Sequence, residues 1–473
     1  MDINQFRKAA HEFVDWMADY LENIENYPVK SQVKPGEVIR QLPQQPPENG
    51  EDVQEIISDF RSIILPGITH WQSPNFFAYF NANSSYPSVL AEMLTATLGA
   101  QCMIWETSPA AAELEELMME WLKQMMGLPD GWHGVIHDTA SAATLIAILS
   151  AREKYSGFQV NEQGFRNYEN FRVYCSTETH SSIDKAVKIA GIGKANLVKV
   201  EVDAELRLRS DALQQAIEQD LAQGKRPLCA IATLGTTGTT AIDPLKEMAE
   251  VCQKYDMWLH VDAAHAGTAL VLPEYRWMID GAEMVDSFVF NPHKWMFTNF
   301  DCSAYFVKDK GQLIRTFEIL PEYLKTQSQG RVNDYRDWGI ALGRRFRALK
   351  LWFVIRNFGV EGIRKKLRFH LSLARDLKKQ IDEHPDFEMM APLTVNLVCF
   401  RYRPAGMAEG ETLNALNQRL NQKLNDSGKI YLTHTKVRGQ YILRMVMGQT
   451  YLTGEHVQKA WQRIQDTTRQ IKV

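Results

Sequence analysis

Lys294 is the residue whose chemistry the surrounding sequence is best suited to support. It lies in Asn291-Pro292-His293-Lys294-Trp295, directly after the apolar run 287–290. Such a run is typical of a short buried strand, and Pro292 ends it because proline has no N–H to donate to a ladder. A lysine just past a strand end lies where open α/β sheets bind ligands, and desolvation there can make its amine nucleophilic. A lone lysine after a turn is more commonly a surface residue.

Asp262 supplies a second chemical group. It ends another apolar run, Trp258-Leu259-His260-Val261-Asp262, upstream of Lys294. A carboxylate and a lysine at neighbouring strand ends are what a pyridoxal phosphate enzyme requires. The lysine binds the cofactor aldehyde as a Schiff base, and the carboxylate keeps the pyridine nitrogen protonated so that the ring can accept electrons. The pair therefore predicts pyridoxal 5'-phosphate as the cofactor.

These two segments together resemble the group II pyridoxal-phosphate-dependent decarboxylases. The resemblance extends from Phe6 to about Trp461, with long matching patches at 69–71, 76–80, 299–304 and 343–347. It is greatest to the members that act on aromatic L-amino acids. The resemblance implies decarboxylation of tryptophan, tyrosine, dopa, 5-hydroxytryptophan or phenylalanine to the amine and carbon dioxide. It also implies a large domain of the fold type I class, the pyridoxal-phosphate-dependent transferase-like fold.

A candidate phosphate site follows another predicted strand. Thr139, Ala140 and Ser141 open a predicted helix over 141–154, and hydroxyl and free N–H groups at a helix start can bind an anion. Plain capping of the helix by Ser141 is the alternative. The resemblance favours a phosphate site, although Asp138 stands where a glycine is usual in the family.

Four more residues are cofactor candidates through the resemblance. It implies that His180 stacks on the pyridine face, opposite Asp262 and Ala264, and touches the substrate carboxylate. It also implies that Thr237 contacts the cofactor and that His293 binds its phosphate. On their own, a loop histidine is usually a solvated surface group and a Gly/Thr turn is an ordinary loop.

The polar segment 323–333 is a candidate catalytic lid, because it has a late glycine and no clear hydrophobic period. Tyr323 is the candidate proton donor to the alpha carbon after carbon dioxide leaves. In the family, a tyrosine here accompanies amine formation and a phenylalanine accompanies oxidative aldehyde formation. A tyrosine that only packs the base of the loop is the alternative.

The candidate substrate pocket draws on several segments. Its predicted members are Trp71, Tyr79, Phe80, Ala82, Gln101, Met103, His180 and Gly343. The resemblance places Gln101 and Met103 in the site of the other subunit, where relatives carry an aliphatic residue and a phenylalanine. Asn81-Ala82 replaces a usual Pro-Thr pair, and His265 replaces a usual tyrosine. Gly343 leaves room for an indole without selecting it over a phenol or a catechol.

Predicted strands and helices alternate in the part of the chain that positions most of these residues. Short apolar runs and helical stretches alternate from 86 to 355, which predicts βαβ units and a mostly parallel sheet in a large α/β cofactor-binding domain. Residues 356–473 predict a small C-terminal α+β domain. Residues 1–85 predict a helical dimerisation segment, because the helix over 4–26 has an apolar stripe without an evident partner. We therefore expect a homodimer with shared active sites.

Composition narrows the class further. The chain has 473 residues, 45% hydrophobic and 23% charged, with a formal net charge of −4. No basic block predicts nucleic-acid binding, no apolar run could span a membrane, and the N-terminus lacks a signal-peptide pattern. The six cysteines lack a C-x-x-C pair and predict buried free thiols in the cytoplasm. No metal-binding motif is present, so no metal is expected.

Two alternative readings remain open at this stage. One is a related decarboxylase for a non-aromatic amino acid, or an aromatic aldehyde synthase. The other is a nucleotide-binding oxidoreductase or a binding protein that uses the same sheet. The second depends on Gly191-Ile192-Gly193, which lacks a third glycine and does not directly follow a strand.

Overall fold

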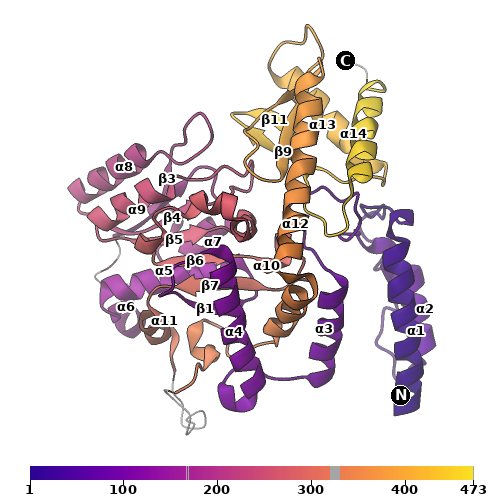
Figure 1. The fold of residues 1–473 in the computed structure, drawn as a ribbon, viewed down its shortest axis with the longest axis horizontal. Coiled ribbons are helices and arrows are strands. Elements are labelled where there is room, and N and C mark those ends of the chain that lie inside the picture. Colours follow the sequence, from indigo (N-terminus) through magenta and orange to yellow (C-terminus); the bar gives the residue numbers. More distant parts are fainter. Residues whose placement is uncertain (167, 169, 320–330, 472–473) are drawn as a thin grey trace. The chain divides into compact units, whose positions relative to one another are not determined.

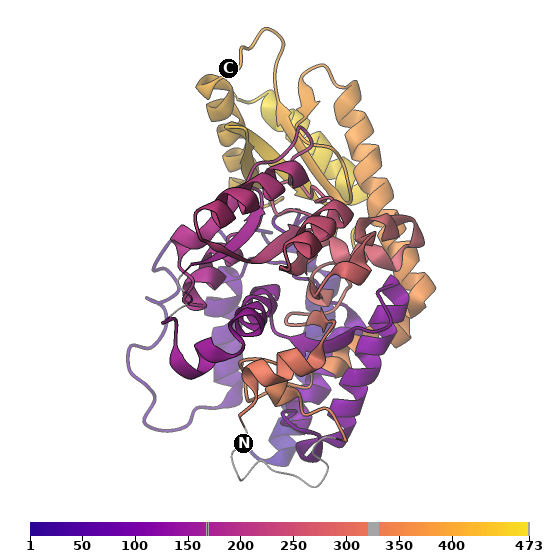
Figure 2. The same cartoon turned by 90° about the vertical axis from the view of Figure 1, so that its left-hand side faces the viewer.

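The computed structural model describes residues 1–473 except 167, 169, 320–330 and 472–473. Packing divides the chain into two compact units, drawn in Figures 1 and 2. The larger unit comprises residues 82–375 and 391–397, and the smaller comprises 1–81, 376–390 and 398–473. The three-domain division with boundaries near 85 and 355 stays a prediction.

Seven strands form the sheet of the larger unit, as far as its residues are described. Its order is β1-β7-β6-β5-β4-β2-β3. The strands are β1 His133–His137, β2 Phe171–Ser176, β3 Leu197–Val200, β4 Arg226–Thr233, β5 Trp258–Asp262, β6 Ser287–Phe290 and β7 Ser303–Val307. From β3 to β6 neighbouring strands are parallel, whereas β7 is antiparallel to both β6 and β1. The predicted α/β class with a mostly parallel sheet is confirmed.

Helices cover both faces of this sheet (Figure 1). They are α3 Tyr86–Leu98, α4 Pro109–Met126, α5 Ala140–Ser156, α6 Gln159–Gln163, α7 Ser182–Ile189, α8 Ser210–Ala222, α9 Leu245–Lys254, α10 Pro292–Trp295, α11 Lys310–Phe317 and the start of α12 Arg347–Glu383. Helices α4, α8 and α9 share one core cluster, and α5 and α7 share the other. Gly359, with φ +66°, interrupts α12.

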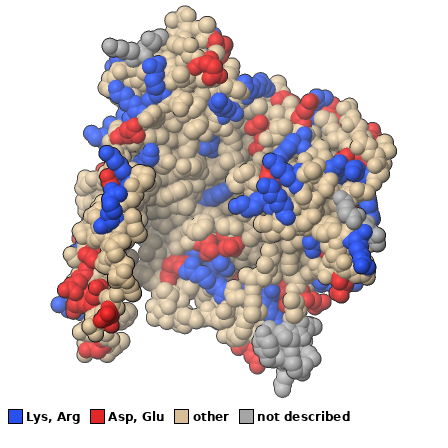
Figure 3. Space-filling view, turned by 180° about the vertical axis from the view of Figure 1, so that it is seen from behind, with Lys and Arg blue, Asp and Glu red and all other residues tan. Residues whose placement is uncertain are grey.

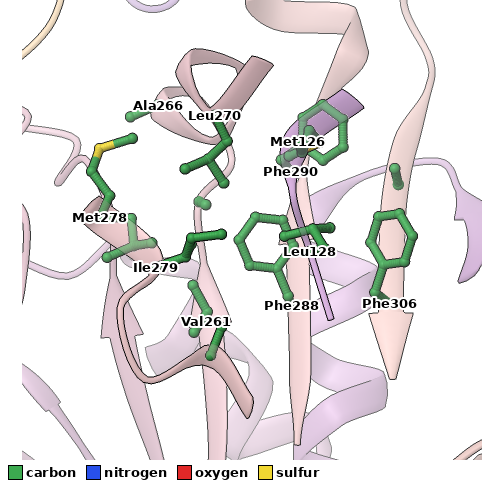
Figure 4. Packing of buried hydrophobic residues seen from close by; sticks show 14 of the residues in the cluster. Met126, Leu128, Val261, Ala266, Leu270, Met278, Ile279, Phe288, Phe290 and Phe306 are labelled. Atoms are coloured by element: carbon green, nitrogen blue, oxygen red, sulfur yellow. The ribbon is translucent and has the colours of Figure 1, made fainter. Parts of the chain in front are cut away.

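Alternating strand residues supply the two cores. On β6, Phe288 and Phe290 join the first cluster while Val289 joins the second, because successive side chains of a strand point to opposite faces. Figure 4 shows the first cluster, in which Phe288 lies between Val261 of β5 and Phe306 of β7. A strand buried on both faces reads as a continuous apolar run, which is why β5 and β6 were predictable.

The smaller unit has its own sheet, with strand order β10-β11-β9-β8 among its described residues. Its strands are β8 Phe387–Met389, β9 Leu397–Tyr402, β10 Thr433–Val437 and β11 Gln440–Val446, and its helices are α1 Ile3–Glu22, α2 Val53–Asp59, α13 Glu411–Asp426 and α14 Gly454–Thr468. The helix predicted over 4–26 forms as α1. Residues 31–50 contain turns but neither helix nor strand, which their prolines explain.

The cysteines and the charged surface residues bear on the class of protein. All six cysteines are buried free thiols, which confirms that prediction. On the face in Figure 3, lysine and arginine are interspersed with aspartate and glutamate. Within the described residues, no helix combines the length and apolar character needed to cross a bilayer, and no group of three or more potential metal ligands occurs.

Candidate active site

Lys294 sits in a turn that is held from two directions. β6 ends at Phe290, and the one-turn helix α10 places Lys294 just beyond it. On one side, the Lys294 N–H donates to the Asn291 carbonyl over 2.9 Å. On the other side, the Asn83 side-chain amide donates to the Lys294 carbonyl, and the Asn83 N–H donates to the His293 carbonyl over 3.1 Å. The backbone that carries the amine is therefore fixed by its own turn and by a distant segment.

The electrostatics of this turn favour a nucleophilic amine. Burial lowers the pKa of Lys294, and the charge of Asp262 opposes that shift. By surface area the lysine residue is partly rather than fully buried, while its neighbours His293 and Trp295 are buried. A lysine whose pKa is lowered by burial is suited to covalent binding of a carbonyl group.

Asp262 ends β5, next to the strand that precedes the lysine. Its register partners are Thr233 on β4 and Val289 on β6. The buried carboxylate accepts a hydrogen bond from the Ala264 N–H at 3.1 Å, and the Ala264 carbonyl accepts one from the Asn291 N–H, also at 3.1 Å. The aspartate and the lysine turn are thus joined through Ala264, as the adjacent strand ends predicted.

A buried polar network supports β5 beneath Asp262. His260 shares hydrogen bonds with Thr144 at 3.1 Å and with Ser287 at 2.9 Å, and Trp258 donates to the same serine at 2.9 Å. Burial lowers the pKa of His260 to about 3, so its imidazole is neutral at physiological pH. A neutral, fully bonded histidine fixes the strand without adding charge behind the carboxylate.

His180 follows β2 and faces the same charges. Its Nδ1 accepts the Ser182 N–H at 3.1 Å, which places the ring proton on Nε2. Desolvation lowers the pKa of His180, Asp262 acts in the opposite direction, and Lys294 lowers it further. The structure therefore brings His180 within electrostatic reach of both predicted partners, with a neutral ring whose Nε2–H can donate.

The start of α5 offers open backbone donors. Thr139 caps the helix by accepting the Ala142 N–H at 3.3 Å, so the cap is Thr139 and the alternative of capping by Ser141 is wrong. Among the described residues, no partner accepts the N–H groups of Ala140 and Ser141. These two donors at a helix N-terminus can bind a phosphate group. The exposed Asp138 carboxylate instead accepts the Thr139 N–H at 2.6 Å.

His293 is buried beside Lys294. Its Nδ1 accepts the Cys302 N–H at 2.9 Å, so Nε2 carries the proton, and its ring packs edge-on against Phe300 with centroids 4.8 Å apart. Burial, aided by Lys294, lowers the pKa of His293 to about 3. A neutral imidazole with a fixed Nε2–H can donate one hydrogen bond to an anion. The donor set of Ala140, Ser141 and His293 thus fits a phosphate.

Thr237 is the exposed tip of a tight loop that follows β4. The Ala241 carbonyl accepts both the Gly235 and Thr236 N–H groups at 3.0 Å, which closes the loop. Gly235 has φ +91°, and a Cβ there would lie 2.6 Å from the Cβ of Ala266. Only glycine allows that approach, so the Gly-Thr-Thr turn is a defined structural feature rather than an ordinary loop.

The predicted substrate residues fall into two separate groups. In the larger unit, the Gln101 side-chain oxygen accepts the Arg344 N–H at 2.7 Å, and its nitrogen lies 3.3 Å from where a Cβ on Gly343 would be. The Met103 carbonyl accepts the Arg336 N–H at 2.9 Å, and Ala82 precedes Asn83. The structure thus brings Gln101 and Gly343 together.

The second group belongs to the smaller unit. Trp71 and Tyr79 stack with ring centroids 5.6 Å apart, and the Tyr79 hydroxyl shares a hydrogen bond of 3.2 Å with Tyr431. The guanidinium carbon of Arg444 lies over the Phe80 ring, 5.4 Å from the centroid of that ring. Tyr79 is 47% exposed, so this group presents an aromatic surface. Tyr323 lies outside the described residues, as does most of the predicted lid.

Two supporting features escaped sequence reasoning. Asn83 holds the lysine turn from a segment far along the chain, and only its place beside Asn81-Ala82 hinted at a role. A buried ion pair of 2.6 Å joins Arg344 to Glu115, and the same carboxylate accepts the Ile136 N–H at 2.8 Å. Helix α4 contains four glutamates, so nothing in the sequence singled out Glu115 for that pair.

Known proteins share the whole architecture. The family model described as the pyridoxal-dependent decarboxylase conserved domain matches residues 35–403. Tyrosine decarboxylase 2 of Narcissus pseudonarcissus is 42% identical, covering 98% of this chain and 94% of the relative. Phenylacetaldehyde synthase of Arabidopsis thaliana is 41% identical, covering 98% and 96%. Tryptophan decarboxylase of Catharanthus roseus, solved with L-tryptophan, superposes with a TM-score of 0.93 at 37% identity, covering 99% of each chain.

Proposed function

Because the chain belongs to the family of pyridoxal-dependent decarboxylases, we propose that it converts an aromatic L-amino acid to the corresponding amine and carbon dioxide. The observation that carries the proposal is the partly accessible Lys294, whose pKa burial lowers, at the strand end next to Asp262. Relatives named for tyrosine, tryptophan and phenylacetaldehyde support an aromatic substrate.

Each site residue has a defined task in this proposal. Lys294 binds the cofactor aldehyde, and Asp262 keeps the ring nitrogen protonated. When bound, pyridoxal 5'-phosphate supplies an electron sink for the electron pair that remains when carbon dioxide leaves. The N–H groups of Ala140 and Ser141 bind its phosphate together with the Nε2–H of His293.

His180 acts on the substrate side. Its Nε2–H is free of the Ser182 bond and donates to the substrate carboxylate, which orients the bond that breaks. Ala264 and Thr237 complete the cofactor contacts. Tyr323 then donates the proton to the alpha carbon, which gives the amine rather than the aldehyde.

The substrate ring meets a partly polar pocket wall. The Gln101 oxygen is engaged by the Arg344 N–H, which leaves its side-chain NH₂ as a donor beside Gly343. That donor suits a ring hydroxyl, as in tyrosine, dopa or 5-hydroxytryptophan. Trp71, Tyr79, Phe80, Met103 and Ala82 are further candidates for substrate contact through the family resemblance.

Two exposed apolar faces support a homodimer with shared sites. On α3, Tyr86, Leu90, Leu94 and Leu98 recur every four residues and are 46–63% exposed. On α1, Phe6 and Phe13 are exposed as well. Contiguous apolar stripes of this kind are unusual on a monomer surface, and a second copy of the chain is the partner we propose. The six buried thiols fit a reducing cytoplasm.

The decisive test is product analysis with a substrate panel. The cofactor-loaded protein is incubated with aromatic, acidic and basic L-amino acids, and amine, aldehyde, carbon dioxide and hydrogen peroxide are quantified. Amine and carbon dioxide in equal amounts, from aromatic substrates only, would support the proposal. Lys294→Ala is the matched inactive control.

An aldehyde synthase is the second candidate, favoured by the relative from Arabidopsis thaliana. Aldehyde and hydrogen peroxide from the panel would establish that activity and remove the role assigned to Tyr323. Turnover of acidic or basic amino acids alone would overturn the aromatic assignment.

A further inference from the structure

A cavity lies in the larger unit, beside the loop that carries Thr237. Its volume is about 380 Å³, and it is bounded by the start of α9, the 3-10 segment Pro273–Ile279 and the short stretch 392–394. Neither Lys294 nor His180 lines it. It is therefore separate from the cofactor site while sharing a supporting loop with it.

The cavity contains both a positive and a negative side chain that could bind a charged ligand. Arg207 pairs with Asp203 at 2.8 Å and with Glu205 at 3.1 Å, so its charge is already balanced. Lys246, Glu247 and Asp280 also line the cavity, and none of the three forms an ion pair with a described residue. One open cation beside open carboxylates suits a ligand that carries both charges.

The cationic end is reinforced by the helix itself. Pro244 precedes the ten-residue helix α9, and no side chain caps that N-terminus. The positive end of the helix dipole therefore adds to the ammonium of Lys246, where a ligand carboxylate would bind. Asp280, which also lines the cavity, would accept a ligand ammonium group.

An indole supplies the remaining surface. Met278 and Ile279 anchor their segment in the core (Figure 4), whereas the adjacent Trp277 is 54% exposed and lines the cavity. A large exposed indole is a favourable stacking partner for another aromatic ring. Pro392 adds an apolar contact in the same cavity.

We propose that this cavity binds a free α-amino acid with an aromatic side chain. The ligand carboxylate lies at Lys246 and the start of α9, its ammonium lies at Asp280, and its ring lies against Trp277. The choice of an aromatic side chain rests on Trp277 and on the proposed function, which makes this a second site for the substrate class.

The cavity is connected to the cofactor site through the loop after β4. Its wall includes Asp243, whose carboxylate accepts the Thr233 N–H and the Leu208 N–H, each at 2.8 Å. The next residue after Thr233, Leu234, donates to the Asp262 carbonyl at 2.9 Å. A ligand held against 241–247 thus braces the strand end that is bonded to Asp262.

The experiment counts bound amino acid without turnover. Holoenzyme inactivated by borohydride reduction is dialysed against radiolabelled L-phenylalanine or L-tryptophan, and bound ligand is counted per chain. Across a series of ligand concentrations, the parent should bind one equivalent beyond the cofactor site, and half-filling of that equivalent should need a higher concentration in Trp277→Ala or Asp280→Asn. Each substitution should weaken that equivalent about tenfold, since it removes one stacking or charge-assisted contact.

Three controls make the outcome specific. Glu283→Gln makes the same charge change as Asp280→Asn three residues along and outside the cavity, and should bind like the parent. Trp277→Phe keeps an aromatic face and should restore binding. Unreduced Trp277→Ala enzyme should keep its kcat within about twofold, because a peripheral contact makes no transition-state interaction.

Equal binding by the parent, Trp277→Ala and Asp280→Asn would overturn the proposal. Phenethylamine binding as tightly as L-phenylalanine would also overturn it, since the amine lacks the carboxylate assigned to Lys246. If the substrate panel shows no aromatic turnover while the extra equivalent persists, the proposed function fails and the second site stands.

Discussion

The strand ends around Lys294 and the edge formed by Gln101 and Gly343 are built in contrasting ways. At the strand ends, Asp262 and His293 are buried and bonded to backbone groups. At the edge, the Gln101 side chain is exposed, and its visible anchor is a single N–H of Arg344. The first region is specified by the sheet of one chain, whereas the second presents an open donor to whatever lies across from it.

The difference teaches where chemistry and selectivity are encoded. A cofactor common to a whole family needs geometry that a sheet can impose, and parallel strand ends impose it repeatedly. Selection among aromatic rings needs only one polar group at an exposed position. Residues of the first kind can change little without loss of activity, whereas residues of the second kind can change with the substrate.

Replacing Lys294 breaks the first region most severely. Lys294→Ala should lower kcat by on the order of a thousandfold or more, because the covalent cofactor bond is lost. It should not lower the melting temperature, since a desolvated amine is removed. Absorbance of the bound cofactor and thermal unfolding check both statements. Lys308→Ala, at an exposed lysine whose amine donates to the Glu283 carbonyl, is the control.

Breaking the Arg344–Glu115 pair tests how firmly the edge is attached. Arg344→Met leaves the Glu115 carboxylate buried without its partner, and should lower the free energy of unfolding by about 3–5 kcal/mol. Urea unfolding measures the change. Glu115→Gln/Arg344→Met should recover part of it, because no buried charge remains. A loss below about 1 kcal/mol, the value of an exposed pair, would show that the pair is solvated.

Asp243, which is bonded to the strand beside Asp262, should make the stability of the folded chain depend on pH. Desolvation raises its pKa to about 7 in the folded chain despite two backbone hydrogen bonds. The folded state therefore holds a proton that the unfolded state releases near pH 4, so this residue's contribution to stability falls as pH rises. Relative to Asp243→Asn, the parent should lose about 2 kcal/mol between about pH 5 and about pH 7. Unfolding at both pH values measures it, and an unchanged difference would mean that Asp243 ionises normally.

The smallest effect should come from the edge itself. Gln101→Leu removes the donor beside Gly343, and should lower the ratio of kcat/KM for tyrosine over phenylalanine by about tenfold. Stability should change little, because the side chain is exposed. Gly343→Ser should act in the same direction more weakly, since its Cβ would press on the Gln101 amide from 3.3 Å. An unaltered ratio of kcat/KM in both variants would show that Gln101 and Gly343 do not contact the substrate ring.

Much of the fold was accessible from local pattern. The runs before Asp262 and Lys294 are buried on both faces, so their hydrophobicity marked the strands, and proline marked an end. β3 was missed because it is a half-buried edge strand whose run, Leu197-Val198-Lys199-Val200, contains a charge. The absence of helix and strand over 31–50 is explained by the prolines of that segment.

The remainder depended on contacts that no local pattern contains. The bond from Asn83 to the Lys294 carbonyl joins residues 211 positions apart. The cap at α5 was assigned to Ser141 as the alternative, yet Thr139 takes that role because its extended backbone lies one residue before the helix. Such choices are settled by tertiary packing, which single-sequence reasoning does not reach.

The position of β7 has a consequence for how the molecule is made. β1 pairs with β7 and with no other described strand of the sheet order, and the N–H of Cys302, just before β7, fixes the tautomer of His293. A ribosome releases the chain from its N-terminus. The nascent polypeptide must therefore hold β1 unpaired, and the lysine turn unfinished, until residue 307 has emerged. Cofactor binding at the completed turn therefore cannot precede synthesis of the first 307 residues of the chain.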